Sequence, residues 1–179
     1  CPVGLWIVAM CAAGDVAGAG TRTEHFDIPP AGWEGVNNRA DPFEPRRVTQ
    51  DFGYSGATRH AGGEPGEIGG RIHPAGESAH YGYRLPRSMT FDDRLQAKGK
   101  LFIPQGPGHF LLGFYNAATL NEWRTPNTIV ARFNGRGDHF HAYAEYCTSR
   151  WRAGTGVIGV LVPGRRLEQT PLAAGDPYV

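Results

Sequence analysis

The chain has 179 residues, including 26 glycines and 14 prolines, and a formal net charge of +1. This near-neutral charge, with no polybasic cluster, gives no electrostatic basis for binding nucleic acid. No apolar run reaches the ~18 residues of a membrane-spanning helix, which argues against membrane insertion. Runs of Leu, Ala, Glu and Lys at helical spacing are almost absent, so the composition predicts an all-β fold with many turns.

The N-terminal stretch differs in kind from the rest. Val3–Ala13 is apolar and has the length of a signal-peptide hydrophobic region, and Ala17–Ala19 fits an A-x-A cleavage site. We therefore expect residues 1–19 to be the remnant of a signal peptide and residues 20–179 to form a single, incomplete β-sandwich domain. The expected location is outside the cytoplasm, secreted or in the cell envelope. The alternative is a buried apolar N-terminal strand.

Cysteine usage agrees with export. Cys147 is the one cysteine left after the presumed leader, so no disulfide is expected within the mature chain. We expect Cys147 to be a small buried residue at a strand end and not a catalytic thiol.

Short aromatic and β-branched segments follow one another along the chain, separated by turn residues. About nine such strands predict a sandwich or jelly roll. A single helical turn is conceivable in Arg87–Gln96, and Trp151–Gly154 is expected to be a turn. The expected strands are Thr23–Ile28, Arg46–Phe52, Glu67–His73, Ser78–Leu85, Leu101–Ile103, Phe110–Asn116, Asn127–Asn134, His139–Cys147 and Gly156–Val162.

Two features of the sequence bear on the geometry of one of these strands and on the end of the domain. The glycines within Glu67–His73 predict a bulge or the close approach of another backbone or ligand. The residues after Pro163 have the pattern of a loop, whereas a closed sandwich would normally end on a strand that pairs with an early one. We therefore expect the chain to be truncated at its C-terminus.

The clearest alternation lies in Asn127–Asn134 and His139–Cys147, which are predicted to form an antiparallel pair with one buried face and one polar face. The turn between them, Gly135–Asp138, contains R-G-D, and we interpret it as a hairpin turn and not as an integrin ligand. The predicted core residues on the apolar face are Ile129, Ala131, Phe133, Phe140, Ala142, Ala144 and Tyr146.

Several short runs of residues, taken together, resemble those of a known family. These runs are Gln50–Ser55, Gly66–Gly70, Gly113–Asn116, Trp123–Arg124 with Pro126–Asn127, Ala144–Thr148 and Trp151–Gly154. As a set, over roughly residues 24–159, the chain resembles an uncharacterised secreted family of environmental bacteria of planctomycete type. That family has a concanavalin A-like, or laminin-G-like, jelly roll. The resemblance implies a fold, export and further strands beyond this chain's end, but no reaction. Jelly rolls of this broad type commonly bind or cleave glycans, which is an analogy from fold alone.

The polar face of the last long strand is the first candidate site. Side chains two residues apart on one face are ~7 Å apart, so His139, His141, Tyr143 and Glu145 would form a row that could line a groove. If the groove binds sugar, Tyr143 would stack on a pyranose ring while His141 and Glu145 bond hydroxyl groups. The alternative is an ordinary solvated sheet face.

A catalytic version of this hypothesis pairs Glu145 with Glu67. Glycosidases need two carboxyl groups about 5–5.5 Å apart for retention or about 6.5–9.5 Å apart for inversion. The sequence supplies no distance, so whether the chain is an enzyme stays open, and a glycoside hydrolase is the class expected if it is one.

The sequence contains two further candidates, a loop and a histidine pair. The loop containing Trp123 and Arg124 offers an aromatic ring and a bidentate cation for recognition, or else Trp123 fills the core and Arg124 pairs with an acid. His139-x-His141 is a weak metal signal without a third ligand fixed by spacing. We therefore predict no metal site and no cofactor, although a structural Ca²⁺ would suit the fold class.

The sequence favours a carbohydrate-binding or cell-surface recognition module that uses a concave sheet face, with a glycan or polysaccharide as partner. The first alternative is a glycan-active hydrolase with the Glu67/Glu145 pair. The second is a structural envelope or adhesion domain without a small-molecule site. The oligomeric state is not predicted.

Overall fold

The computed structural model describes residues 4–9, 22–39, 50–73, 79–90, 92–104, 108–119, 127–161, 164 and 166–167. Over these ranges the protein is all-β, because twelve strands are accompanied only by the short 3₁₀ helix η1 (Ala117–Thr119). All strand pairs are antiparallel. The predicted all-β class is therefore confirmed.

The first sheet has five strands in the order β12-β6-β1-β4-β3. It contains early, middle and late parts of the chain, and β12 returns to pair with β6. Its strands are β1 (Gly4–Ala9), β3 (Asp51–Ser55), β4 (Glu67–Arg71), β6 (Gly99–Phe102) and β12 (Arg166–Leu167).

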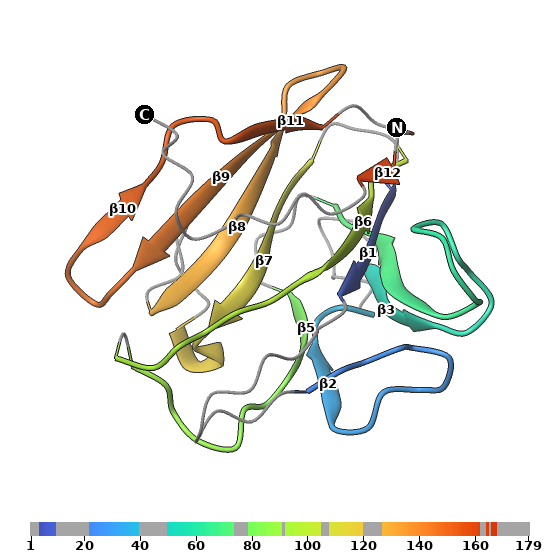
Figure 1. Ribbon diagram of the computed structural model, residues 1–179, viewed down its shortest axis with the longest axis horizontal. Helices are drawn as coiled ribbons and strands as arrows, with labels where there is room; N and C mark the ends of the chain where they lie inside the picture. Colours follow the sequence, from blue (N-terminus) through green and yellow to red (C-terminus); the bar gives the residue numbers. More distant parts are fainter. Residues whose placement is uncertain are drawn as a thin grey trace, which may run out of the picture.

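The second sheet follows the order β10-β9-β8-β7, with β11 also pairing with β9. A separate two-stranded ribbon joins β2 to β5. Figure 1 shows the second sheet at one side of the molecule, β1 and β6 at the other, and the ribbon below them. These strands are β7 (His109–Tyr115), β8 (Thr128–Gly135), β9 (Phe140–Cys147), β10 (Arg152–Gly154), β11 (Gly159–Leu161), β2 (Trp33–Val36) and β5 (His80–Tyr83).

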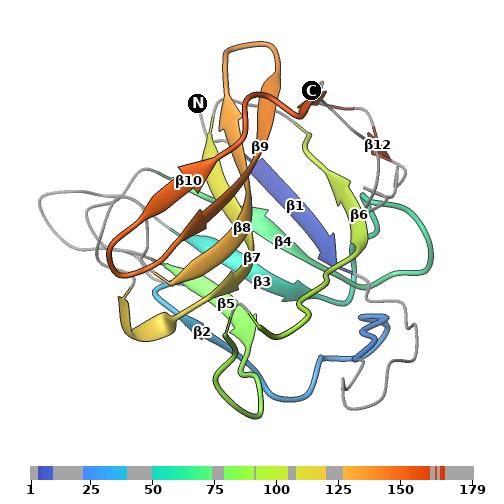
Figure 2. The ribbon, with the colours of Figure 1, turned by 60° about the vertical axis from the view of Figure 1, so that its left-hand side comes forward.

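The apolar N-terminal stretch contributes strand β1, which lies between β4 and β6 and pairs with both. Figure 2 shows β1 between β4 and β6. Residues 4–9 therefore form a strand, as in the alternative that the sequence left open, and the burial of their side chains lies outside what the structure describes. The signal-peptide hypothesis stays a prediction.

The core joins the two sheets. Leu101 of β6 and the neighbouring Ile103 pack in one cluster with buried side chains of β7, β8, β9 and β11. Within it, the rings of Phe110 and Phe133 stack with centroids 4.7 Å apart. Apolar side chains from two sheets thus share one interior, an arrangement consistent with a β-sandwich. The members from the second sheet are Phe110, Phe133, Phe140, Ala142 and Leu161.

Part of the predicted core is wrong. Ile129 and Tyr146 are 37% and 43% exposed, and Ala144 is also exposed. At the same end of the strands, Val130 and Glu145 on the opposite face are buried. The buried face therefore changes partway along β8 and β9, because strand alternation is preserved but a different face is covered at each end.

The glycines of β4 show the predicted close approach of another backbone. Gly70 has φ +141°, and a Cβ built there would lie 2.0 Å from the carbonyl oxygen of Asp51 on β3. The pairing of β4 with β3 runs without interruption from Asp51↔Arg71 to Ser55↔Glu67. Close strand packing, and not a bulge, therefore accounts for glycine here.

Two local predictions are wrong. Thr23–Ile28 is not a strand, because Phe26 has φ +59° and turns its ring into a buried contact with Trp33. Arg152–Gly154 is strand β10 and not a turn. The turn comes earlier, where the Thr148 hydroxyl accepts the backbone N–H of Trp151.

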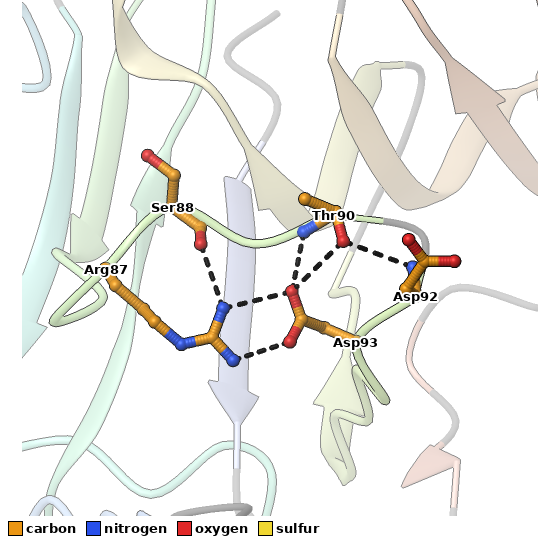
Figure 3. A network of polar contacts seen from close by, with 5 residues as sticks. All are labelled: Arg87, Ser88, Thr90, Asp92 and Asp93. Carbon is orange, nitrogen blue, oxygen red and sulfur yellow. Dashed lines mark hydrogen bonds and ion pairs between the residues drawn. The ribbon is translucent and has the colours of Figure 1, made fainter.

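Arg87–Gln96 contains no helix in its described residues, but the backbone N–H of Asp93 bonds the carbonyl of Thr90 at 3.1 Å and closes a single turn. Side-chain contacts also hold this loop, as Figure 3 shows. The guanidinium of Arg87 bonds both carboxylate oxygens of Asp93 and the carbonyl of Ser88. Asp93 also accepts the backbone N–H of Thr90, and these donors hold the pKa of Asp93 well below its usual range.

Several smaller predictions are confirmed. The turn predicted at Gly135–Asp138 is present, and residues 136–139 connect β8 to β9, closed by a 2.7 Å bond from the backbone N–H of Arg136 to the carbonyl of His139. Cys147 is 3% exposed at the end of β9.

Of the expected strand Arg46–Phe52, residues 46–49 lie outside the described ranges, and β3 begins at Asp51.

Candidate ligand-binding face

The candidate site is the polar face of β8 and β9, which we call the polar row. It consists of Arg132, Asn134, His139, His141, Tyr143 and Glu145, with Asp138 from the adjoining turn. The antiparallel register places Arg132 beside Tyr143 and Asn134 beside His141. Because alternate residues of a strand share a face, these side chains project from the same side of the sheet.

The half of the row nearest the hairpin is a chain of hydrogen bonds. The His139 ring has its Nδ1 2.6 Å from Oδ1 of Asp138 and its Nε2 3.0 Å from Nε2 of His141. The Nδ1 of His141 lies 3.3 Å from the Tyr143 hydroxyl. His139 stabilises the ionised Asp138, so the pKa of that carboxyl is lowered. The four side chains therefore hold one another in place.

The other half of the row centres on Arg132. Its Nε donates to Oε1 of Glu145 at 2.6 Å, and its guanidinium carbon lies 4.2 Å from the centroid of the Tyr143 ring. The Arg132 and Glu145 side chains are 12% and 6% exposed. One face of Tyr143 is thus covered by the cation, and Glu145 is a buried member of an ion pair. Arg132 was missed from the sequence, although its place on the polar side of Asn127–Asn134 was visible.

Glu67, the second predicted carboxylate, lies in the first sheet at the start of β4. It is fully buried. Its Oε1 accepts the Nδ1–H of His60 at 2.6 Å, and its Oε2 accepts the backbone N–H of Ala61 at 3.2 Å. Burial raises the pKa of Glu67, but hydrogen bonds from His60 and Ala61 outweigh burial and leave this pKa below its ordinary value. Glu67 ties the loop between β3 and β4 to the sheet.

Glu67 and Glu145 therefore belong to different sheets, and each is engaged by its own partners. Trp123 and Arg124, the other predicted ligand-binding residues, lie outside the described ranges. Two aromatic side chains near β10 are exposed, Trp151 at 74% and Tyr146 at 43%. Trp151 lies just before β10, and Tyr146 lies on β9, on the face opposite the polar row.

The described residues contain no group of three or more His, Cys, Asp or Glu side chains arranged to hold a metal ion. They also contain no helix with the length and apolar character needed to cross a membrane. Comparison with protein-family models, with curated proteins and with solved structures yields no match.

Proposed function

We propose that this protein is a carbohydrate-recognition module whose ligand lies along the polar row. The observation that supports the proposal is the set of half-buried polar side chains, His141, Tyr143 and Asn134, on one face of adjacent strands. Sugar recognition needs a few fixed hydrogen-bonding groups beside an apolar surface. The bonds within the row fix these groups before any ligand arrives, which lowers the entropic cost of binding.

The structure changes how Tyr143 would act. Since Arg132 covers one face of its ring, a sugar would contact the opposite face or the hydroxyl. Glu145 would not bond sugar hydroxyls directly, because it is buried against Arg132. It would act by positioning Arg132, and His141 and Asn134 would supply the polar contacts.

The finer fold assignment belongs to the same proposal. A concanavalin A-like jelly roll is supported by two sheets that share a core and by the return of β12 to a strand of the first sheet. Export is supported by the apolar Val3–Ala13 stretch and the Ala17–Ala19 motif. A chain cleaved after Ala19 would lack β1, so the N-terminal mass of the exported protein would show whether β1 belongs to the mature fold.

A polysaccharide panel tests the proposal. We expect binding to at least one glycan, with affinity at least about tenfold lower, or about 1.4 kcal/mol, in Tyr143→Ala and Asn134→Ala. Tyr146→Ala is the matched control, because Tyr146 lies on β9 but on the opposite face. Equal affinity in wild type and Tyr143→Ala would contradict the proposal. Failure of the whole panel would favour the structural envelope domain.

The hydrolase alternative is less well supported by these contacts. A glycosidase acid needs a raised pKa, whereas the pKa of Glu67 is lowered. We expect no release of reducing sugar from any bound glycan. Release by wild type that Glu145→Gln and Glu67→Gln abolish, while both variants stay folded, would establish the enzyme instead.

A further inference from the structure

The two imidazoles at the hairpin end of the polar row have an unusual arrangement. His139 and His141 stand two residues apart on one face, with their rings at centroids 4.8 Å apart and tilted by 42°. Their Nε2 atoms are only 3.0 Å apart. Both rings thus direct the same nitrogen, Nε2, at one shared region.

The opposite nitrogen of each ring already faces an oxygen. An ionised carboxylate can only accept, so the Nδ1 of His139 must carry the hydrogen that Asp138 receives. In the neutral ring, this places the lone pair of His139 on Nε2. The Tyr143 hydroxyl faces the Nδ1 of His141, and when it accepts a hydrogen there, the second Nε2 lone pair is directed at the first.

Two convergent lone pairs repel unless a proton or a cation lies between them. Without a metal, the other tautomer of His141 would place a proton between the two Nε2 atoms, as in the hydrogen-bonded chain of the polar row. A metal ion would take the place of that proton, and an oxygen partner on the outer nitrogen of each histidine is the arrangement seen around protein-bound metals. The carboxylate of Asp138 would fix the tautomer and orientation of the His139 ring, and Tyr143 would fix the orientation of His141.

The 3.0 Å distance between the two Nε2 atoms also limits the coordination geometry of a metal ion bound by both. With metal–nitrogen bonds of about 2.0–2.1 Å, two nitrogens at that spacing subtend about 91–97° at the metal. This angle fits neighbouring positions of a square-planar or octahedral ion such as Cu²⁺ or Ni²⁺. A tetrahedral Zn²⁺ site would require the nitrogens to be about 3.3 Å apart.

We propose that His139 and His141 form a two-histidine site for a divalent transition ion of the Cu²⁺ or Ni²⁺ type, with Asp138 and Tyr143 as supporting residues. The described residues provide no third His, Cys, Asp or Glu ligand for such a site, so among them the remaining positions are left to solvent. The site is therefore open and exchangeable. The proposal does not depend on glycan binding.

Calorimetric titration of the tag-free protein with Ni²⁺, without glycan, tests the site. We expect one ion per chain and an affinity at least about tenfold lower in His139→Ala and in His141→Ala. Asp138→Asn should weaken binding by about tenfold, because it removes the supporting carboxylate without removing a ligand. Cu²⁺ should bind more tightly than Ni²⁺ at the same site.

His25→Ala is the matched control, since His25 is exposed and far along the sequence from the pair. It should leave the affinity unchanged. Thermal midpoints of all variants would be compared to verify folding, and Asp138→Asn tests the site should a histidine variant unfold. Absence of Ni²⁺ and Cu²⁺ binding, or equal affinity in His139→Ala and wild type, would overturn the proposal. Because the titration contains no glycan, its failure leaves the proposed carbohydrate function unaffected.

Discussion

Replacing Glu67 by Gln should destabilise the protein markedly, although the two side chains have nearly the same shape. The carboxylate offers two accepting oxygens, one to the Nδ1–H of His60 and one to the N–H of Ala61. A glutamine has one accepting oxygen and an amide NH₂ group. One of the two donors would then face another donor inside the protein.

The magnitude follows from the burial of these groups. A hydrogen bond to a charged group contributes about 1.5–3 kcal/mol, and an unsatisfied buried donor costs about 1–3 kcal/mol. His60 is 38% exposed and can turn to water, whereas Glu67 is fully buried and Ala61 is 4% exposed. We therefore expect Glu67→Gln to lower the free energy of unfolding by about 3 kcal/mol at neutral pH, or about 6–12 °C in Tm.

The pH dependence gives a second, sharper test. The pKa of Glu67 in the folded protein is below its ordinary value of 4.5, so its stabilising effect is fully present above that value. The effect is lost as pH falls through the folded pKa, because the wild-type carboxyl is then protonated as well. The difference in stability between wild type and Glu67→Gln should therefore shrink in acid.

Urea unfolding followed by tryptophan fluorescence, at neutral pH and at several values below 4.5, would measure this difference. Glu64→Gln is the control, because Glu64 is an exposed residue of the same loop and should stay within about 0.5 kcal/mol of wild type. An unchanged unfolding midpoint in Glu67→Gln at neutral pH would refute the argument. So would a difference from wild type that does not vary with pH.

Three further predictions use other parts of the fold. Gly70→Ala should prevent folding or lower the free energy of unfolding by at least about 3 kcal/mol, because its Cβ would lie 2.0 Å from a backbone oxygen. The control is Gly156→Ala, at an open position, which should leave the thermal unfolding midpoint nearly unchanged. Burial and the charge of Glu34 raise the pKa of Tyr115 to about 12, so native protein should show a late tyrosinate absorbance change on titration that Tyr115→Phe removes. Since a raised folded pKa means stability is lost at high pH, Tyr115→Phe should also reduce the loss of stability above about pH 10. Deletion of β1 should lower the unfolding midpoint in urea, because β4 and β6 would lose the strand that pairs with both of them. An unchanged midpoint would show that β1 contributes nothing to stability.

Strands and core positions were predicted most accurately from the sequence where one physical signal dominated a segment. Phe133, Phe140 and Ala142 lie in the core as expected, since alternation with aromatic residues identifies a half-buried strand. It failed at Phe26, where a single residue with positive φ breaks an apparently extended segment. It also failed at Arg152–Gly154, whose three exposed residues form a strand only because β9 lies beside them.

The candidate site was predicted in outline. His139, His141 and Tyr143 do share one face and bond to one another. The partner of Glu145 was not predicted, because Arg132 is brought beside it by the register of two strands and not by sequence spacing. The role of Glu67 likewise depends on a loop that folds back onto β4.

The sequence by itself determined the all-β class, the positions of β7, β8 and β9, and the turn at Gly135–Asp138. These features depend on side-chain period and turn chemistry, which are local properties of the chain. Only the tertiary structure decided which face of each strand is buried at each point. In β9, for example, the consecutive residues Glu145 and Tyr146 are buried and exposed, respectively. The physical reason is that alternation gives a strand two faces, whereas burial depends on which segments, distant in sequence, pack against each face.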